Sequence, residues 1–327
     1  MAVSHAVVWQ AATVRESAPV AERIRRIVLQ PDQPRRIEPG AHVDVRVPSP
    51  DGPLERSYSI VEPVGDDGAY AISVFEGEVS RGGARAMHAL AVGDRLEVTD
   101  PRQDFPFRPG AAQYVFLAGG VGVTAILGMA RAARRAGVDY RVAYCGRARD
   151  AMAYLDELQA EHDDRLRVHI RSEGTGLDAA AFVDSVPPGA ELYLCGPIRL
   201  MDAVRRAWAA AGRPASLLRF ETFGNSGWFE PEEFVVAVPA AGIECVVPPH
   251  QSMLEALELA GADALSDCRK GECGLCEARV LRVSGVIDHR DVFYSERQRA
   301  ASARICVCVS RVTAGEAGAG RIELELT

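Results

Sequence analysis

The chain has 327 residues, of which 48% are hydrophobic and 25% charged, and its formal net charge is −8. This length predicts two or three domains, each able to bury its own core. The acidic net charge argues against nucleic-acid binding, which needs a basic face. The sequence contains no run of about 18 apolar residues, so we expect no membrane span. The N-terminus lacks a signal-peptide pattern, and five of the eight cysteines follow residue 267. We therefore expect a metal site in a cytoplasmic protein.

The first 108 residues have the pattern of a small antiparallel β-barrel. Hydrophobic and polar residues alternate over short stretches, as expected for half-buried strands. These stretches are 6–9, 25–29, 42–47 and 70–75. Turn-forming glycine, proline and aspartate residues separate them at 39–40, 50–52 and 66–68. Short strands at this spacing favour a barrel or a sandwich.

One of the expected strands carries Arg56, Ser57, Tyr58 and Ser59. Strand alternation places Arg56 and Tyr58 on one face and the two serines on the other. The first face would offer a cation for a phosphate and a ring for stacking. Alone, the motif is more simply explained as an exposed arginine beside an ordinary strand tyrosine.

A second candidate for phosphate contact is the turn Arg81-Gly82-Gly83, which precedes a helical pattern at 85–90. Backbone amides at the start of a helix can hold a phosphate, and glycines let it approach. An ordinary turn and helix cap is the alternative interpretation.

The middle of the chain predicts a doubly wound parallel sheet. A buried strand at 114–118 is followed by the glycines Gly119, Gly120 and Gly122, then Thr124 and a helical pattern at 126–136. This strand, turn and helix form a nucleotide-binding unit, although the spacing is not the G-x-G-x-x-G of the dinucleotide motif. Two more strand–helix pairs are expected at 141–144 with 151–161 and at 192–194 with 201–211.

Two further features of this region concern the nucleotide. Cys195, Gly196 and Pro197 end a strand at the carboxyl edge of the expected sheet, where ligands bind in open α/β folds. By itself this tripeptide is equally a buried cysteine and a loop. Arg147 and Arg149 follow the 141–144 strand and could reach the adenosine end of a dinucleotide.

The last third contains strands, one helix and a cysteine-rich loop. A hairpin is expected from 233–238 and 244–247, and Ser252 should cap a helix at 253–260. Further strands are expected at 278–281 and 321–326.

Cys268, Cys273 and Cys276 have C-x4-C-x2-C spacing, which is the plant-type spacing for a [2Fe-2S] cluster with a distant fourth thiolate. Glycines at 271 and 274 suit a loop that turns tightly around a cluster. A structural zinc site would more commonly use two short cysteine pairs, and a disulfide would suit a secreted protein. The fourth ligand is Cys306, after 29 intervening residues, or Cys308, after 31. Both would lie on the same face of a strand, so alternation leaves the choice open.

The arginine–tyrosine motif, the glycine turns and their order resemble the phthalate dioxygenase reductase family, which includes the vanillate demethylase reductases. The resemblance covers nearly all of the chain. It implies an antiparallel β-barrel flavin domain (1–108), an α/β doubly wound nicotinamide domain (109–228) and an α+β ferredoxin-like β-grasp domain with a plant-type [2Fe-2S] cluster (233–327).

The resemblance also implies the cofactors and their contacts. The flavin would be FMN, with Arg56 and the glycine turn on its phosphate and Tyr58 along its ring, although Ala84 replaces the usual serine. The nicotinamide would lie beside Cys195; NADH is favoured, and the two arginines leave NADPH open. Ala125 replaces a usual proline. The cofactor-contacting residues expected are Arg56, Ser57, Tyr58, Ser59, Arg81, Gly82, Gly83, Gly119, Gly120, Gly122, Thr124, Arg147, Cys195, Gly196 and Pro197.

For the cluster, the family motif places Ser-Arg two residues after the fourth cysteine. Ser310-Arg311 follows Cys308 in this way, so the expected ligands are Cys268, Cys273, Cys276 and Cys308. The tetrad at 288–291 is another mark of the family.

The implied activity is electron transfer from NADH through FMN and the cluster to an oxygenase. A nicotinamide gives two electrons together, a [2Fe-2S] cluster takes one, and a flavin can do both. No catalytic residue is expected beyond the cofactors. A Rieske-type aromatic oxygenase or demethylase is the expected partner of a monomeric reductase. The alternatives are a reductase for a haem monooxygenase and a redox-sensing cluster module.

Overall fold

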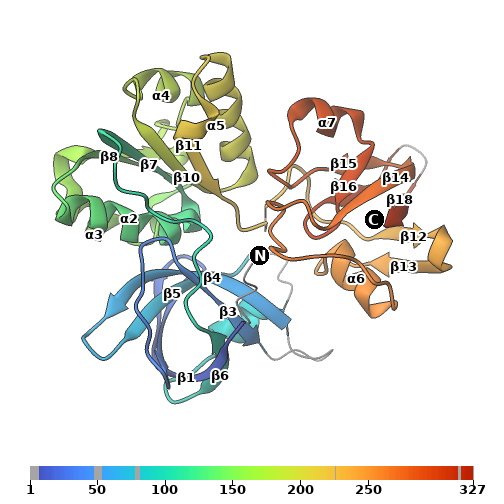
Figure 1. Cartoon of the computed structure of the whole chain (residues 1–327), viewed down its shortest axis with the longest axis horizontal. Helices are drawn as coiled ribbons and strands as arrows, with labels where there is room; N and C mark the ends of the chain where they lie inside the picture. Colours follow the sequence, from blue (N-terminus) through green and yellow to red (C-terminus); the bar gives the residue numbers. More distant parts are fainter. Residues whose placement is uncertain (1–6, 48–53, 78–81, 225, 316–317, 327) are drawn as a thin grey trace, which may run out of the picture. The chain divides into compact units, whose positions relative to one another are not determined.

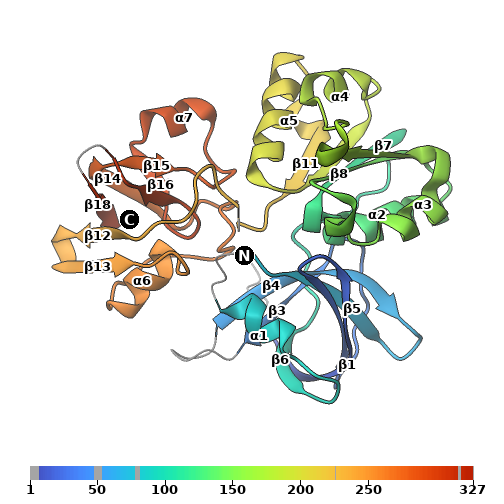
Figure 2. The ribbon, with the colours of Figure 1, turned by 180° about the vertical axis from the view of Figure 1, so that it is seen from behind.

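The computed structural model describes residues 7–47, 54–77, 82–224, 226–315 and 318–326. The chain divides into two compact units (Figures 1 and 2). The first comprises Met1–Gly196 with Ala203–Glu221, and the second Pro197–Asp202 with Thr222–Thr327. A barrel and a parallel sheet lie in the first unit, and a mixed sheet lies in the second. These architectures confirm the fold class expected from the sequence. In the described part of the chain, no helix is long and apolar enough to cross a membrane.

A closed antiparallel barrel with the order β1-β2-β5-β4-β3-β6 begins the first unit. Alternate residues of its strands point inward and fill it with aliphatic side chains such as Val14, Ile27 and Val98. The short helix α1 (Gly83–His88) adds the buried Met87 to this core. The strands are β1 (Trp9–Ala21), β2 (Ile24–Pro31), β3 (His42–Val47), β4 (Leu54–Val64), β5 (Ala69–Phe75) and β6 (Arg95–Thr99).

The third strand has the bounds expected from its alternation, and the arginine–tyrosine motif lies on β4 as expected. The first strand differs most, because it runs to Ala21, far beyond the expected 6–9. Its alanines, serine and proline do not favour a strand, but pairing with both β2 and β6 holds it extended. Residue 6 and the expected turn at 50–52 lie outside the described residues.

A five-stranded sheet with the order β11-β10-β7-β8-β9 completes the first unit, and all of its pairs are parallel. The strands are β7 (Gln113–Gly119), β8 (Asp139–Gly146), β9 (Leu166–Ile170), β10 (Glu191–Cys195) and β11 (Leu218–Glu221). The helices are α2 (Val123–Arg135), α3 (Leu155–His162), α4 (Ala179–Ser185) and α5 (Ile198–Ala210). The sequence did not predict β9, α4 or β11, which are short elements of four to seven residues.

The barrel and the parallel sheet are joined by close backbone packing and by a charged network. In α2, a Cβ on Gly128 would lie 3.3 Å from the Val61 carbonyl of β4, so the helix lies directly on the barrel. Arg131 in the same helix donates to Glu62 of β4 and to Glu161 of α3, the latter at 2.7 Å. Burial opposes its charge, but these carboxylates together raise the pKa of Arg131. The guanidinium in turn lowers the pKa of Glu161.

The second unit is built on a mixed sheet with the order β13-β12-β18-β14-β16, in which only the β12–β18 pair is parallel. A small β15–β17 ribbon lies beside it. The strands are β12 (Phe234–Val238), β13 (Ile243–Val247), β14 (Glu277–Ser284), β15 (Val286–Asp288), β16 (Arg304–Cys306), β17 (Arg311–Thr313) and β18 (Gly320–Leu326). The helices are α6 (Met253–Leu259) and α7 (Glu296–Ala301). The expected hairpin and the Ser252 cap are both present, and Ser252 forms a capping box with Glu255.

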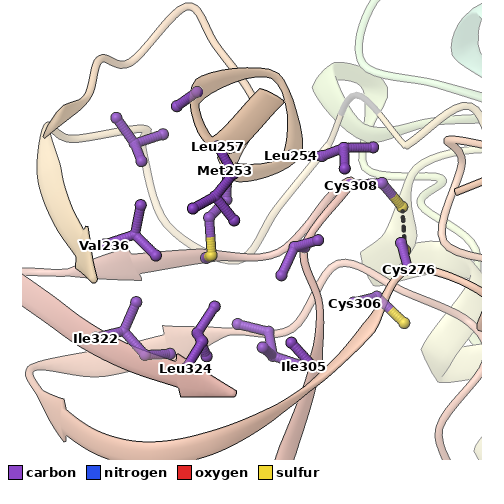
Figure 3. Close-up of a cluster of buried hydrophobic side chains, with 14 of the residues drawn as sticks. Val236, Met253, Leu254, Leu257, Cys276, Ile305, Cys306, Cys308, Ile322 and Leu324 are labelled. Atoms are coloured by element: carbon purple, nitrogen blue, oxygen red, sulfur yellow. Dashed lines mark hydrogen bonds between the residues drawn. The ribbon is translucent and has the colours of Figure 1, made fainter. Parts of the chain in front are cut away.

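The core of the second unit lies between α6 and the sheet (Figure 3). Leu257 and Met253 of the helix pack toward Val236 and Ile322 of the strands. At one end of this core three cysteines replace aliphatic side chains, and all three are buried. The hydrophobic core therefore continues directly into the cysteine site.

The contribution of the Arg131 network to the free energy of unfolding should be measurable. Arg131→Met keeps the aliphatic stem but removes the guanidinium that pairs with Glu161 and leaves Glu62 with Arg26 alone, so we expect a loss of about 2 kcal/mol in unfolding free energy at neutral pH. Because the pKa of Glu161 is lowered on folding, this stabilisation is present above the usual glutamate pKa and disappears as pH falls through the folded value. The gap between variant and wild type should therefore narrow below about pH 4.

Urea unfolding across a pH series measures this gap. The control is Arg135→Met, on an exposed position of the same helix, which should change stability by less than about 0.5 kcal/mol. Equal losses in the two variants, or a gap that does not depend on pH, would contradict the role given to Arg131.

Candidate functional site: a thiolate centre and a nucleotide edge

The loop between α6 and β14 carries the first three cysteines of the expected cluster. The Cys268 sulfur accepts backbone N–H groups from Lys270, Glu272 and Cys273, each at 3.4 Å. Such amides stabilise negative charge on sulfur, and the loop must curl around Cys268 to supply all three. The local fold is therefore already suited to a thiolate.

The sulfurs are arranged as two neighbouring pairs. The sulfur atoms of Cys276 and Cys308 lie 3.0 Å apart, and Cys273 is hydrogen-bonded to Cys268. The neighbouring thiols of Cys306 and Cys308 lower the pKa of Cys276 to about 3. Among the described residues, no group of three or more histidine, cysteine or acidic side chains is placed to share a single ion.

Cys306 and Cys308 do not lie on one strand, which corrects the expectation from alternation. Strand β16 ends at Cys306, and the amides of Val309 and Ser310 both donate to the Cys306 carbonyl, which makes 307–309 a turn. This turn carries Cys308 to the cluster loop, where the Gly271 amide donates to its sulfur. The two cysteines therefore have different neighbours, although only one residue separates them.

Glycines in the loop are required by space as well as by backbone angle. Gly271 has a φ of 77°, and a Cβ there would lie 2.6 Å from a methyl group of Val309 and 2.9 Å from the Cα of Asp291. Gly274 has the same φ, and its Cβ would lie 2.3 Å from the ring of Phe293. A side chain at Gly271 would have to displace the Asp291 backbone, and one at Gly274 would have to displace the Phe293 ring.

A buried ionic network supports the loop, and it contains the tetrad at 288–291 that marks the family. Arg290 donates to Asp288 at 2.7 Å and to the Phe229 carbonyl at 3.0 Å, and Asp288 accepts the Trp228 amide. Each of the four tetrad residues is no more than 7% exposed. The next residue, Val292, donates its amide to Gly271. The tetrad thus joins the cluster loop to the segment that precedes β12.

The Ser-Arg pair after Cys308 has a structural role of the same kind. Ser310 accepts the Arg290 amide at 3.3 Å. The buried Arg311 donates to the carbonyls of Glu232, Val247, Pro248 and Gln251. The side chains after Cys308 therefore fix the turn that holds this cysteine.

In the barrel, the two expected phosphate-contacting pieces lie together. A Cβ on Gly83 would lie 3.2 Å from the Arg56 side chain, so the Arg56 stem lies over this glycine. Gly82 has a φ of 84°, and α1 begins at the next residue. Tyr58 is half-buried on the same strand as Arg56. Arg81 lies outside the described residues.

The two serines of the motif have partners elsewhere. Ser57 donates to Asp44 of β3 at 2.5 Å, and the buried Ser59 donates to Glu221 at 3.4 Å. Both hydroxyl groups thus have protein acceptors.

The two turns expected to meet the nicotinamide nucleotide are in direct contact. A Cβ on Gly122 would lie 2.4 Å from the Cys195 carbonyl oxygen and 2.9 Å from the Gly196 nitrogen. This approach sets the glycine turn after β7 against the end of β10 at the carboxyl edge of the sheet. Gly119 ends β7, Gly120 has a φ of 52°, and Thr124 is buried with its hydroxyl bonded to the Val121 carbonyl. Pro197 follows at the start of α5.

The two arginines after β8 differ. Arg149 forms a two-point ion pair with Glu173, at 2.6 and 2.9 Å. Arg147 is exposed, with Glu22 3.7 Å away.

Comparison with known proteins identifies this arrangement. Residues 237–313 match the family described as 2Fe-2S iron-sulfur cluster binding domain. Over 309 residues the chain is 33% identical to the carnitine monooxygenase reductase subunit of Escherichia coli (strain K12), covering 91% of this chain and 94% of the relative. The chain belongs to the reductase components of oxygenase systems, the family of the phthalate and vanillate reductases.

Two solved structures extend the comparison. Phthalate dioxygenase reductase, described as a modular structure for electron transfer from pyridine nucleotides to [2Fe-2S], is 29% identical, with a TM-score of 0.74 and coverage of 97% of this chain and 98% of that one. An intact type IV self-sufficient cytochrome P450 monooxygenase is 34% identical, with a TM-score of 0.65; the match covers 98% of this chain and 41% of that one.

The residues present fit a [2Fe-2S] cluster. Each iron of such a cluster takes two cysteine ligands, and the four sulfurs are already arranged two and two. The amides on Cys268 and the glycines at 271 and 274 provide the surroundings that a negatively charged cluster needs.

The loop geometry predicts a selective effect of one substitution. Gly271→Ala places a methyl group against Val309 and the Asp291 backbone, so the protein should lose most of its iron. Gly261→Ala is the matched control, because Gly261 also has a positive φ (87°) but has no heavy atom within 4 Å of its Cβ position. Iron analysis and the visible spectrum distinguish them. Equal iron content in both variants would show that space around Gly271 does not matter.

Proposed function

We propose that this chain is the NADH-dependent reductase of an oxygenase system and delivers electrons one at a time through a [2Fe-2S] cluster. One observation carries the proposal: a paired-thiol centre and a nucleotide-type sheet edge occur in one chain, together with the barrel motif expected to hold a flavin. The flavin supplies the conversion between two-electron and one-electron transfer that such a combination requires. We further propose three domains, at 1–108, 109–228 and 233–327.

For the flavin we propose FMN, held in the barrel. The contact between Arg56 and Gly83 supports this assignment, because a guanidinium beside a glycine turn can hold a single terminal phosphate. Gly82 and Arg81 would complete the phosphate contacts. Tyr58 would lie along the flavin ring, and Ser57 and Ser59 would hold the strand through Asp44 and Glu221.

For the nicotinamide nucleotide we propose the edge formed by Gly119, Gly120, Gly122 and Thr124 against Cys195, Gly196 and Pro197. The close approach of Gly122 to Cys195 supports it, since only glycine leaves room there. We favour NADH over NADPH because Glu173 neutralises Arg149, so this arginine is less suited to a 2′-phosphate. Arg147 would face the adenosine end.

For the cluster we propose Cys268 and Cys273 on one iron and Cys276 and Cys308 on the other. The sulfur pairing and the amide from Gly271 to Cys308 support this division.

For the partner we propose a Rieske-type oxygenase that meets a monomeric reductase in the cytoplasm. None of the eight cysteines forms a disulfide, which supports a reducing compartment. The alternative partner is a haem monooxygenase, favoured by the 34% identity to the self-sufficient P450. Candidate Rieske and haem oxygenases, each supplied with this reductase and NADH, would separate the two.

The cofactor assignment predicts a defined composition. Acid extraction of the purified protein should release FMN, and metal analysis should find two irons per flavin. The same protein should reduce cytochrome c with NADH. Release of FAD alone, or zinc in place of iron, would contradict the proposal.

The fourth ligand is tested by two serine variants. Cys308→Ser should lose or grossly alter the visible and electron paramagnetic resonance (EPR) spectra of the cluster, because it removes a sulfur from the Cys276 iron. Cys306→Ser should retain a four-thiolate spectrum. The reverse result would assign Cys306 as the ligand.

The charge of the third domain predicts that electrostatic attraction guides its encounter with the oxygenase. Residues 232–327 contain 15 acidic and 10 basic side chains, so an acidic face should steer toward a basic patch on the oxygenase. With a Debye length of about 10 Å at 0.1 M ionic strength, added salt should slow transfer to the oxygenase far more than reduction of the flavin by NADH. Stopped-flow measurement of both steps decides this. Parallel salt dependences would mean that the carboxylates only solvate the surface.

A further inference from the structure

The turns that follow β8 and β9 meet at the carboxyl edge of the parallel sheet, next to the proposed nucleotide site. Gly146 at the end of β8 is the register partner of Ile170 at the end of β9. The amide of Ser172 donates to the carbonyl of Arg147 at 2.9 Å, which joins the two turns directly. Ligands of open α/β folds bind at this edge. Side chains from both turns are therefore placed to contact the same part of a bound nucleotide.

Glu173 lies on the second of these turns, and hydrogen bonds fix the backbone around it. The Thr175 hydroxyl accepts the Ile170 amide at 3.0 Å and donates to the Ile170 carbonyl at 3.1 Å. Gly174 has a φ of 74°, and its amide donates to the Arg171 carbonyl at 3.1 Å. These bonds close the turn on itself, so the backbone that carries Glu173 has little freedom to move.

Glu173 and Arg149 form an ion pair with favourable geometry. Two guanidinium nitrogens of Arg149 donate to the two carboxylate oxygens, at 2.6 and 2.9 Å. Most exposed ion pairs contribute little, but a two-point pair of this kind holds both side chains in one orientation. The Arg149 side chain is 56% exposed, so a bound nucleotide could reach it. Arg147 is 72% exposed, and its contact with Glu22 is longer, at 3.7 Å.

These charges bear on the difference between the two nicotinamide nucleotides. NADPH carries a 2′-phosphate on its adenosine ribose, where NADH has a free hydroxyl group. An arginine commonly accommodates the phosphate, and an acidic residue favours the hydroxyl. Here Glu173 occupies two donors of Arg149 and adds a negative charge beside them. A 2′-phosphate would have to displace this carboxylate before it could pair with Arg149.

We propose that Glu173 determines the nucleotide specificity: by pairing with Arg149 it closes a 2′-phosphate site that Arg147 and Arg149 would otherwise form. The inference rests on the proposed nucleotide edge. It goes beyond that proposal by assigning the discrimination to one side chain, which acts through the arginine that it neutralises. Removal of the Glu173 charge therefore opens the phosphate site.

The test measures binding of NAD⁺ and NADP⁺ to the oxidised full-length protein by isothermal titration calorimetry. These two nucleotides differ only in the 2′-phosphate, and neither reduces the flavin. Glu173→Gln removes the charge but keeps the size of the side chain, and the same change is repeated in an Arg149→Met background. Asp184→Asn is the control, because it removes the same charge from an exposed position on α4. A second readout is the ratio of kcat/KM for NADPH to that for NADH.

We expect Glu173→Gln to tighten NADP⁺ binding about tenfold, through one added charge-assisted pair, and to change NAD⁺ binding by less than about twofold. The kcat/KM ratio should rise by a similar factor. In the Arg149→Met background most of this gain should disappear, because the change at Glu173 no longer releases a guanidinium. Asp184→Asn should match wild type.

Four results would overturn the inference. These are unchanged NADP⁺ binding in Glu173→Gln, equal tightening of NAD⁺ and NADP⁺, a gain that persists in full without Arg149, and a wild-type protein that already binds NADP⁺ more tightly than NAD⁺. A wild-type protein that binds neither nucleotide would instead refute the proposed function. The two failures are therefore distinguishable.

Discussion

The need to hold negatively charged sulfur inside a protein is the constraint on which the second unit depends. Thiolates next to a hydrophobic core are unfavourable unless donors and fixed charges compensate them. Here the compensation is local: three amides point at Cys268, and a fourth points at Cys308. The glycines make this possible, because the loop must turn where a Cβ would collide with Val309 or Phe293.

The same constraint explains why charged residues are buried behind the loop. Arg290 and Asp288 pair with each other and with backbone groups at 228 and 229, and Arg311 satisfies four carbonyls. Most polar groups of these networks already have hydrogen-bond partners, and a movement would break those bonds. The networks therefore hold the cluster loop and the turn of Cys308 in one arrangement. In the first unit, the Arg131 network likewise fixes two parts of the fold together, the barrel and the parallel sheet.

Local patterns in the sequence were sufficient to predict the parallel sheet, the β3 bounds and the three-cysteine loop, because alternation and spacing record them directly. The choice of a barrel over a sandwich and the β-grasp domain came from the family resemblance. These local patterns did not predict the features that depend on tertiary contacts. Strand β1 runs through residues of low strand propensity because two neighbours pair with it, and the turn after Cys306 depends on hydrogen bonds to a single carbonyl. The contact between Gly122 and Cys195 joins positions more than seventy residues apart, and no short window contains it. The tetrad could have been found as charged residues in an otherwise apolar stretch, but its partners could not.

Electrons from NADH should reach the cluster only through a flavin. The most direct measurement uses protein depleted of flavin but retaining its cluster, mixed with NADH without oxygen while the visible absorbance of the cluster is followed. We expect no bleaching on the timescale of turnover, and rapid bleaching after FMN is restored. Bleaching of the cluster by NADH in the flavin-free protein would contradict it.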